Sequence, residues 1–165
     1  GYVPKGFVSD GILTLKELLS ELYPSLPHQR CTVHVFLAAR AKVATGRKVP
    51  ERSKEFIELL RIILWSRTLA EAKRRTRKLW EIQELTSSER RALEYIWPAL
   101  PQCFVCREKR FRRLHLPRSS NAIENVIGQV EARLKTRRGI KSEASIELLI
   151  NELLLQVTEQ TITHN

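Results

Sequence analysis

Apolar residues recur in two rhythms along this chain, and the rhythm changes near Gly46. Before that glycine, short β-prone runs over 7–9 and 29–35 alternate with segments over 12–22 and 36–44 that have helical spacing. Strand-like runs that alternate with helical segments are typical of α/β folds. We therefore expect two strands, each followed by a helix.

The first predicted strand ends at Asp10-Gly11, a pair that favours turns. An acidic side chain therefore stands at the carboxyl end of a strand. Thr14 and Glu17 have the spacing of a capping box and are predicted to open the first helix. Pro24 is expected to end it, because proline cannot continue a helix.

Every element that the pattern predicts after the glycine at 46 is helical. The first three helices are expected over 50–64, 68–85 and 86–97. Thr68 with Glu71, and Thr86 with Glu89, have capping-box spacing at the starts of two of them. Pro98 is predicted to end the third. Together these helices would form an all-α insertion.

The next segment, 98–118, is basic, contains prolines and has weak periodicity, so we interpret it as a loop or hinge. Residues 119–121 supply capping side chains for a helix that should end at Gly139, and Ser142 caps a final helix with an apolar stripe. We therefore divide the chain into 1–45, the first part of a mostly helical α/β core; 46–115, a helical insertion and hinge; and 116–165, the C-terminal helices of the core.

Composition limits what such a fold could do. Hydrophobic residues make up 42% of the 165 residues, enough to bury a core and too many for a disordered basic tail. Apolar runs such as 153–155 are far shorter than the roughly 20 residues of a membrane-spanning helix, so we expect a soluble protein without a membrane partner. The net charge of +11 favours a polyanionic partner.

The positive charge is concentrated in three segments, 73–78, 107–118 and 133–141. Each segment alone has an ordinary interpretation as a solvated helix face. Three of them together favour a nucleic acid, because clustered Lys and Arg side chains bind phosphates without regard to base sequence.

Two carboxylates, Asp10 and Glu124, stand at a strand end and in the first turn of a helix. Each has a structural explanation, as a turn residue or as a partner of the helix dipole. Three blocks accompany them: Val-Ser-Asp-Gly over 8–11, Gln-Arg-Cys-x-x-His over 29–34 and Ser-Ser-Asn-Ala-Ile-Glu-Asn over 119–125. In this order the blocks resemble those of the DDE transposases of the Mutator-like group, whose bacterial members include the insertion-sequence family with a longer TTNAIE form of the last block.

The resemblance covers residues 6–44 and 116–157 and implies a ribonuclease-H-like fold interrupted by the helical insertion. It implies that Asp10 and Glu124 are the second and third of three acids that hold two Mg²⁺ or Mn²⁺ ions roughly 4 Å apart. The implied activity is cleavage of DNA at transposon ends and strand transfer to target DNA by a homo-oligomer. Such a protein would work in the cytoplasm, at the nucleoid, of a bacterium or archaeon, or in a eukaryotic nucleus.

In that family the first acid lies on the first strand of the fold, upstream of the second. Nine residues precede Asp10 here, and none of them is acidic. We therefore expect a partial fold that lacks the leading strands, from the carboxyl-terminal part of a catalytic domain or from a truncated copy, with an incomplete metal site. Two other functions stay open: a non-catalytic DNA-binding remnant of a transposase, and a ribonuclease-H-like nuclease without a joining step.

Side chains near the acids and on the insertion are predicted to contact DNA. They are Asn121, Arg112, Arg113, Arg118, Arg133, Lys135, Arg137, Arg138 and Trp97. The cations would offset phosphate charge, and Trp97 would stack on a base, a contact worth about 1–3 kcal/mol. A tryptophan at helical spacing is also a common core residue, so both interpretations of Trp97 stay open.

The three cysteines are too few and too unevenly placed for a disulfide framework, which indicates a reducing compartment. Cys31 with His34, and Cys103 with Cys106, form two pairs at the spacing of zinc ligands. If the pairs met, a tetrahedral Zn²⁺ site would clamp the insertion to the core. Burial without a metal is the alternative, because free cysteine is commonly buried.

Overall fold

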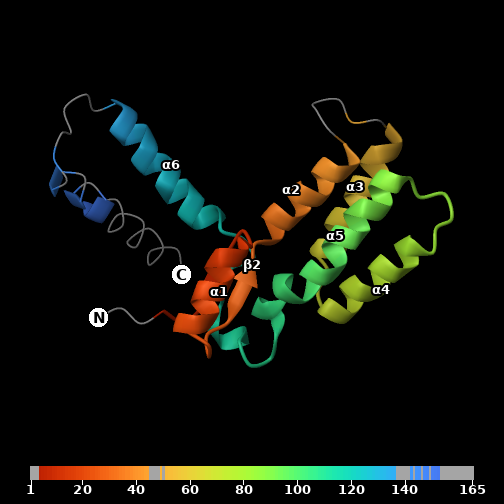
Figure 1. Ribbon diagram of the computed structural model, residues 1–165, viewed down its shortest axis with the longest axis horizontal. Helices are drawn as coiled ribbons and strands as arrows, with labels where there is room; N and C mark the ends of the chain where they lie inside the picture. The colour runs from red at the N-terminus through yellow and green to blue at the C-terminus, as the bar shows by residue number, and fades with distance from the viewer. Residues whose placement is uncertain are drawn as a thin grey trace. The chain divides into compact units, whose positions relative to one another are not determined.

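The computed structural model describes residues 4–44, 49, 51–136, 142, 144–145, 147–148 and 150–152 (Figure 1). Contacts divide the chain into two compact units, Gly1–Ser119 and Ser120–Asn165, and we describe each by itself. The described residues are mostly helical with one small parallel sheet, which is consistent with the predicted α/β class.

The first unit begins with a β-α-β arrangement (Figure 1). Strand β1 (Phe7–Ser9) pairs in parallel with β2 (His28–Arg30), with Phe7 opposite His28. Helix α1 (Leu13–Leu22) connects the two strands. Parallel neighbours need such a crossover, so the predicted order of strand, helix and strand is confirmed.

The capping box predicted for α1 is wrong. Thr14 already lies within the helix, whose N-cap is Ile12, a residue without a capping side chain. The preceding turn explains the earlier start, because Asp10 Oδ1 accepts a hydrogen bond from the Ile12 amide at 3.2 Å. The apolar positions Leu18 and Leu22 of this helix remain exposed.

The second β-prone run is mostly helical instead. Strand β2 ends at Arg30, Cys31 is an N-cap, and α2 occupies Thr32–Val43, so it begins before the predicted position 36. Val35 and Ala39, one turn apart, are fully buried in the core of the first unit. The β-branched residues at the start of α2 favour a strand locally, but burial of one helical face decides the outcome.

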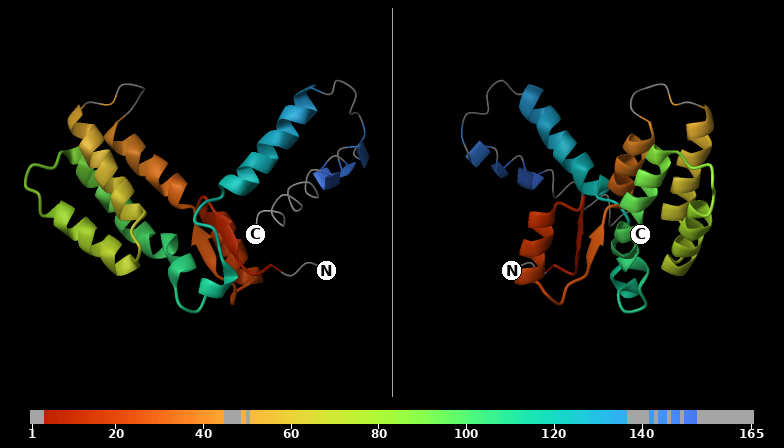
Figure 2. Two further views of the ribbon diagram at one scale, coloured as in Figure 1. Left: turned by 180° about the vertical axis from the view of Figure 1, so that it is seen from behind. Right: turned by 45° about the vertical axis from the view of Figure 1, so that its right-hand side comes forward.

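Helices α3 (Glu51–Leu64), α4 (Leu69–Trp80) and α5 (Ser87–Cys103) pack with α2 in one group (Figures 1 and 2). Helices α3 and α5 each contact the other three, and the most extensive packing in the group is between α2 and α5. The buried side chains of the group include Phe56, Leu60, Ile63, Leu64, Leu79, Leu93, Ile96 and Leu100. The three helices predicted after position 46 are therefore confirmed.

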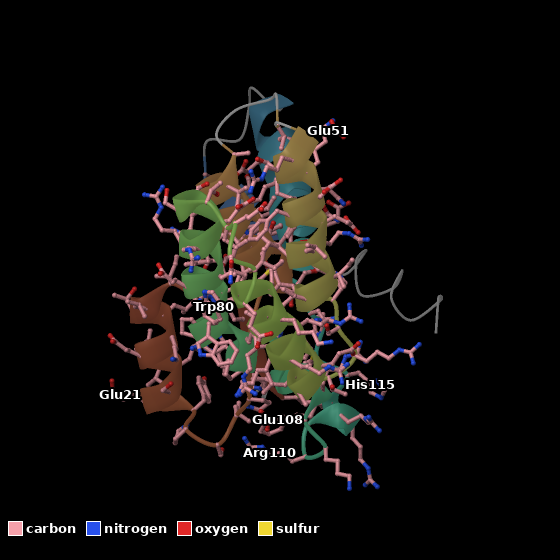
Figure 3. The ribbon with its side chains drawn as sticks, turned by 90° about the vertical axis from the view of Figure 1, so that its right-hand side faces the viewer. Glu21, Glu51, Trp80, Glu108, Arg110 and His115 are labelled. Carbon is pink, nitrogen blue, oxygen red and sulfur yellow. The ribbon has the colours of Figure 1, made fainter. Side chains whose placement is uncertain are left out.

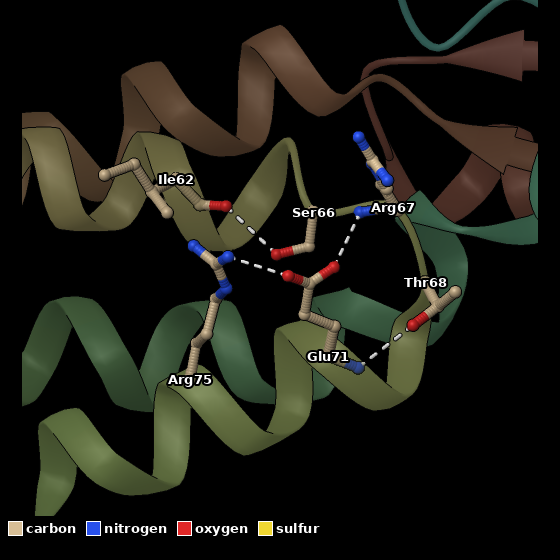
Figure 4. A network of polar contacts seen from close by, with 6 residues as sticks. All are labelled: Ile62, Ser66, Arg67, Thr68, Glu71 and Arg75. Atoms are coloured by element: carbon tan, nitrogen blue, oxygen red, sulfur yellow. Dashed lines mark hydrogen bonds and ion pairs between the residues drawn. The ribbon is translucent and has the colours of Figure 1, made fainter.

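A small polar network holds the start of α4 (Figure 4). Thr68 Oγ1 accepts a hydrogen bond from the Glu71 amide at 3.1 Å, as predicted. The Glu71 carboxylate accepts from the Arg67 amide at 3.1 Å and from the Arg75 guanidinium at 2.7 Å. These two bonds, the one from Arg67 first, lower the pKa of Glu71. The helix ends at Trp80 rather than at the predicted position 85.

Helix α5 continues past its predicted end. Thr86 and Glu89 make both bonds of the predicted capping box. The helix then passes through Pro98 and Pro101 and ends at Cys103, so the prediction that it stops at Pro98 is wrong. A proline inside a helix costs about 3 kcal/mol. The inner face of α5 is buried as far as Cys103, and this burial offsets the lost hydrogen bond.

Residues 104–118 contain two single-turn 3₁₀ helices, η1 (Val105–Arg107) and η2 (Arg112–Leu114). The end of this segment is anchored, because the carbonyl oxygen of Arg118 accepts a hydrogen bond from the Thr32 amide at 2.8 Å. The loop or hinge predicted over 98–118 thus begins only at position 104.

In the second unit, α6 (Asn121–Thr136) begins at the predicted caps, while the predicted end at Gly139 lies outside the described residues. The residues 144–145, 147–148 and 150–152 are helical, and the Ser145 amide donates to Ser142 Oγ at 3.3 Å. Within the described part of the chain, no helix is long and apolar enough to cross a membrane.

We expect Pro98→Ala to raise the free energy of unfolding by about 1–3 kcal/mol, because alanine restores an amide donor inside α5 at an exposed position. Urea unfolding followed by circular dichroism measures the change. Pro117→Ala, which lies outside the helices, is the control and should lower the value by less than about 1 kcal/mol. No gain at Pro98 would show that packing of the ring compensates for the missing bond.

Candidate functional site

Asp10 lies directly after β1, where the sequence predicts it, and its side chain is exposed. Its Oδ1 accepts the hydrogen bond from the Ile12 amide, which holds the carboxylate at the start of α1. Gly11 has a φ of 97°, a left-handed conformation that favours glycine. A Cβ at Gly11 would lie 2.4 Å from Nε of Arg30, so the space as well as the backbone requires glycine here.

Arg30, at the end of β2, connects this acidic turn with the helical group. Its Nη2 donates to the hydroxyl of Tyr95 on α5 at 3.0 Å, and its Cζ lies 5.6 Å from the Tyr95 ring centroid. Lys42 of α2 approaches the same ring, with Nζ at 5.0 Å from the centroid. The Nε of Arg30 is buried and makes no hydrogen bond to the described residues. A positive charge is therefore fixed beside the Asp10-Gly11 turn.

A second contact supports the turn from the neighbouring strand. Ser9 Oγ lies 2.6 Å from His28 Nε2, within hydrogen-bond distance. Burial, and then the charge of Lys16, lowers the pKa of His28 below its usual value of 6.5, so the ring is neutral at pH 7. The pair joins the residue before Asp10 to β2.

Gln29 is fully buried and binds three backbone groups. Its Nε2 donates to the carbonyl oxygens of Cys103 at 2.8 Å and of Arg30 at 2.9 Å. Its Oε1 accepts from the Cys106 amide at 3.0 Å. Because buried polar groups require partners, this one side chain fixes β2 against the end of α5 and against η1.

The predicted zinc ligands lie around the same junction. Cys31 and Cys103 are fully buried, and Cys106 is half-buried. Burial raises the pKa of Cys103 to about 12, and the neighbouring Cys31 and Cys106 add to the effect. Among the described residues, no three His, Cys, Asp or Glu side chains form a group that could hold a metal ion. Zinc at Cys31, His34, Cys103 and Cys106 therefore stays a prediction.

Glu124 belongs to the second unit, in the first turn of α6, and its side chain is exposed. Ser120 Oγ donates to its carboxylate, and the Glu124 amide donates to the Ser120 carbonyl at 3.1 Å. Asn121 is exposed at the start of the same helix. Arg137, Arg138 and the side chains of Arg133 and Lys135 lie outside what the structure describes. Since Asp10 lies in the first unit, the pairing of the two acids also stays a prediction.

The other predicted DNA contacts include three arginines in the segment that follows α5 and precedes α6 along the chain. Arg112 and Arg113 are exposed on η2. Arg118 is half-buried, its Cζ lies 5.2 Å from the Phe104 ring centroid, and its Nη2 donates to the Leu64 carbonyl. Burial is the main cause that lowers the pKa of Arg118.

Trp97 is half-buried, and its environment fits both predicted roles. Its ring packs against Trp80, which Figure 3 labels at the end of α4, with 5.4 Å between the centroids. Two cations of α4 also approach the Trp97 ring, Arg77 with Cζ at 5.6 Å and Lys73 with Nζ at 6.0 Å. The tryptophan is thus part of the packing between two helices and lies next to a basic surface.

Comparison of the chain with known protein families identifies the class of protein. The family model described as "Transposase, Mutator family" matches residues 6–163, which include both acids and all four packed helices. The chain is therefore a transposase chain. Among transposases it belongs to the Mutator family, as the three sequence blocks indicate. Comparisons with curated proteins and with solved structures give no match.

Gln29, Arg30, His28 and Tyr95 organise this region, and the sequence alone does not predict that role. Gln29 and Arg30 belong to the sequence block over 29–34, but the block does not predict which groups their side chains bind. The residues that Gln29 and Arg30 bind on α5 and η1 lie 65 to 77 positions away along the chain. Only the packed structure shows these contacts.

We expect Gln29→Leu to lower the free energy of unfolding by about 2–4 kcal/mol, because each buried backbone group left without a partner costs about 1–3 kcal/mol. Urea unfolding measures the loss. Gln83→Leu, at an exposed position between α4 and α5, is the matched control and should change the value by less than about 0.5 kcal/mol. Equal values for the two variants would contradict the role assigned to Gln29.

We also expect stability to fall above pH 9 because of Cys103. Its pKa is about 12 in the folded chain and 9.0 when unperturbed, so its stabilising effect is complete below pH 9 and is lost between pH 9 and 12. The free energy of unfolding should fall by at most about 1.4 kcal/mol per pH unit from this group. Urea unfolding between pH 8 and 11 should show a shallower fall in Cys103→Ala, and parallel curves would refute the assignment.

Proposed function

We propose that this chain is the catalytic-domain portion of a DNA transposase, and that it cleaves and joins DNA strands by metal-dependent phosphoryl transfer with Asp10 and Glu124 as metal ligands. The observation that carries the proposal is the setting of Asp10, an exposed carboxylate after a parallel strand in a turn that Gly11 and Arg30 shape. Membership in the Mutator family supports the same assignment. In this proposal the β1-α1-β2 unit is part of a ribonuclease-H-like fold.

The donors fit Mg²⁺ or Mn²⁺, because these hard ions prefer carboxylate oxygens and take phosphate oxygens as their other ligands. Asp10 and Glu124 would hold the ions together with oxygens from the substrate and from a third acid. When bound, the ions activate the attacking hydroxyl and stabilise the leaving oxygen of an in-line displacement.

The side chains of the chain itself have separate tasks in this reaction. Asp10 and Glu124 would supply carboxylate oxygens that hold the metal ions beside the reacting phosphate. Arg30 keeps the Asp10 turn in position through its contacts with Gly11 and Tyr95. The exposed cations of η2 offset the charge of the DNA backbone. The substrates in this proposal are transposon ends and target DNA, bound by a homo-oligomer.

The test uses the protein expressed from its whole reading frame, with Mg²⁺ or Mn²⁺ and plasmid DNA that carries the flanks of its own gene. We expect nicked and joined products on gels. Asp10→Asn and Glu124→Gln should each lower the rate by more than about 100-fold, because they remove direct metal ligands. Glu131→Gln, at an exposed position on the same helix as Glu124, is the control and should retain the rate.

Three outcomes would contradict the proposal. Activity that survives Glu124→Gln removes this residue from the mechanism. Cut products without joined ones indicate a nuclease. If the unmodified protein binds the DNA, as measured by fluorescence anisotropy, but does not cut it, the chain is a DNA-binding remnant.

A further inference from the structure

Two hollows flank the turn-rich segment between α5 and α6. The first, of about 330 Å³, is lined by Arg107, Arg112, His115 and Arg118, with Cys106 and Leu116 among the remaining residues. We call it the arginine hollow. No acidic residue is among the described residues that line it. The second hollow, of about 180 Å³, shares Arg107 and Arg112 with the first and is also lined by Arg67 and by the acidic residue Glu108.

Ion pairs within the described residues leave the charge of the arginine hollow in place. The nearest acid along the chain, Glu108, binds Arg110 at 2.7 Å, and Figure 3 shows these two side chains beside each other. None of the ion pairs found in this part of the chain involves Arg107, Arg112 or Arg118. Three guanidinium groups therefore share one small concave surface without compensation.

Arg118 gives this surface a fixed cation. Its Nη2 is held by the Leu64 carbonyl and its guanidinium lies over the Phe104 ring. Its Nε is buried and makes no hydrogen bond to the described part of the chain. Burial is the largest cause that lowers the pKa of Arg118, and the charge of Arg107 acts in the same direction, as expected for two cations that repel each other, while Cys106 and Cys103 act in the opposite direction. A bound anion would relieve this repulsion.

His115 at the edge of the hollow has a strained backbone. Its φ of 50° and ψ of 38° are left-handed, and His115 is the one described residue other than glycine with positive φ. Such conformations cost of order 1–3 kcal/mol and occur often at ligand sites. His115 lines the arginine hollow together with the three arginines.

We propose that the arginine hollow binds a phosphate group of the DNA backbone. Guanidinium groups bind phosphate oxygens in pairs of parallel hydrogen bonds, which suits a concave site with three of them. Leu116 and Pro117 give the hollow an apolar wall, which suits the sugar next to a backbone phosphate better than a free phosphate ion in water. This inference rests on the proposed function, since it assigns a contact to the DNA substrate.

The test is fluorescence anisotropy of duplex DNA with the full chain over a range of salt concentrations. Arg107→Gln with Arg112→Gln should weaken binding about 10-fold at low salt and reduce the slope of the logarithm of affinity against the logarithm of salt by about 1. Arg90→Gln with Arg91→Gln removes the same charge from exposed residues that do not line either hollow. This control should change affinity by less than about 3-fold.

A second arm distinguishes backbone phosphate from free phosphate. Inorganic phosphate should compete with DNA more strongly than chloride at equal ionic strength, and only when Arg107 and Arg112 are present. If inorganic phosphate competes with DNA but the double variant and its control bind DNA equally well, the hollow binds free phosphate and the proposal is overturned. Equal affinities and slopes without competition would overturn it as well.

The two proposals fail in different ways. Glu124→Gln tests cutting, whereas the arginine variant tests affinity. Loss of affinity in the arginine variant supports the hollow even if Glu124→Gln retains activity. A normal affinity in the arginine variant removes the hollow even if Glu124→Gln abolishes cutting.

Discussion

The first unit depends on the buried amide of Gln29. This side chain supplies two donors and one acceptor to backbone groups at the ends of three elements: β2, α5 and η1. The packed helices exclude water, so without Gln29 these backbone groups would be buried without hydrogen-bond partners. The Gln29 side chain therefore joins the short sheet to the helical group by satisfying backbone groups at their junction.

The next residues along the strand extend this connection toward the candidate site. Arg30 contacts Tyr95 on α5 and lies against Gly11, while Cys31 is the N-cap of α2. Three consecutive residues thus contact three different parts of the unit. The position of Asp10 follows from the same arrangement, because the turn that holds its carboxylate has the Arg30 side chain on one side. Residues of the insertion in this way help to place an acid that lies far from them in the sequence.

Local signals in the sequence predicted some local features correctly, although the capping box expected at Thr14 does not form. The Thr86 capping box and the turn at Asp10 depend on neighbours within four positions, and both form as expected. The end of α5 could not be predicted in this way, since Pro98 argues locally for a stop and only distant burial keeps the helix intact. The same limit applies to the site. Its acid is visible in the sequence, whereas the contacts of Gln29 and Arg30 depend on how helices pack after folding.

The position of the excess charge distinguishes the segment 104–118 from the helices. On the helices, cations such as Arg61 and Arg75 bind acids one turn away, so their charge is largely cancelled. The segment 104–118 contains one acid against six Lys and Arg side chains, and that acid binds Arg110. Arg118 is instead held by a carbonyl oxygen and an aromatic ring, contacts that orient a guanidinium without neutralising it. Charge that is oriented and uncompensated attracts phosphate more strongly than the same charge in surface ion pairs.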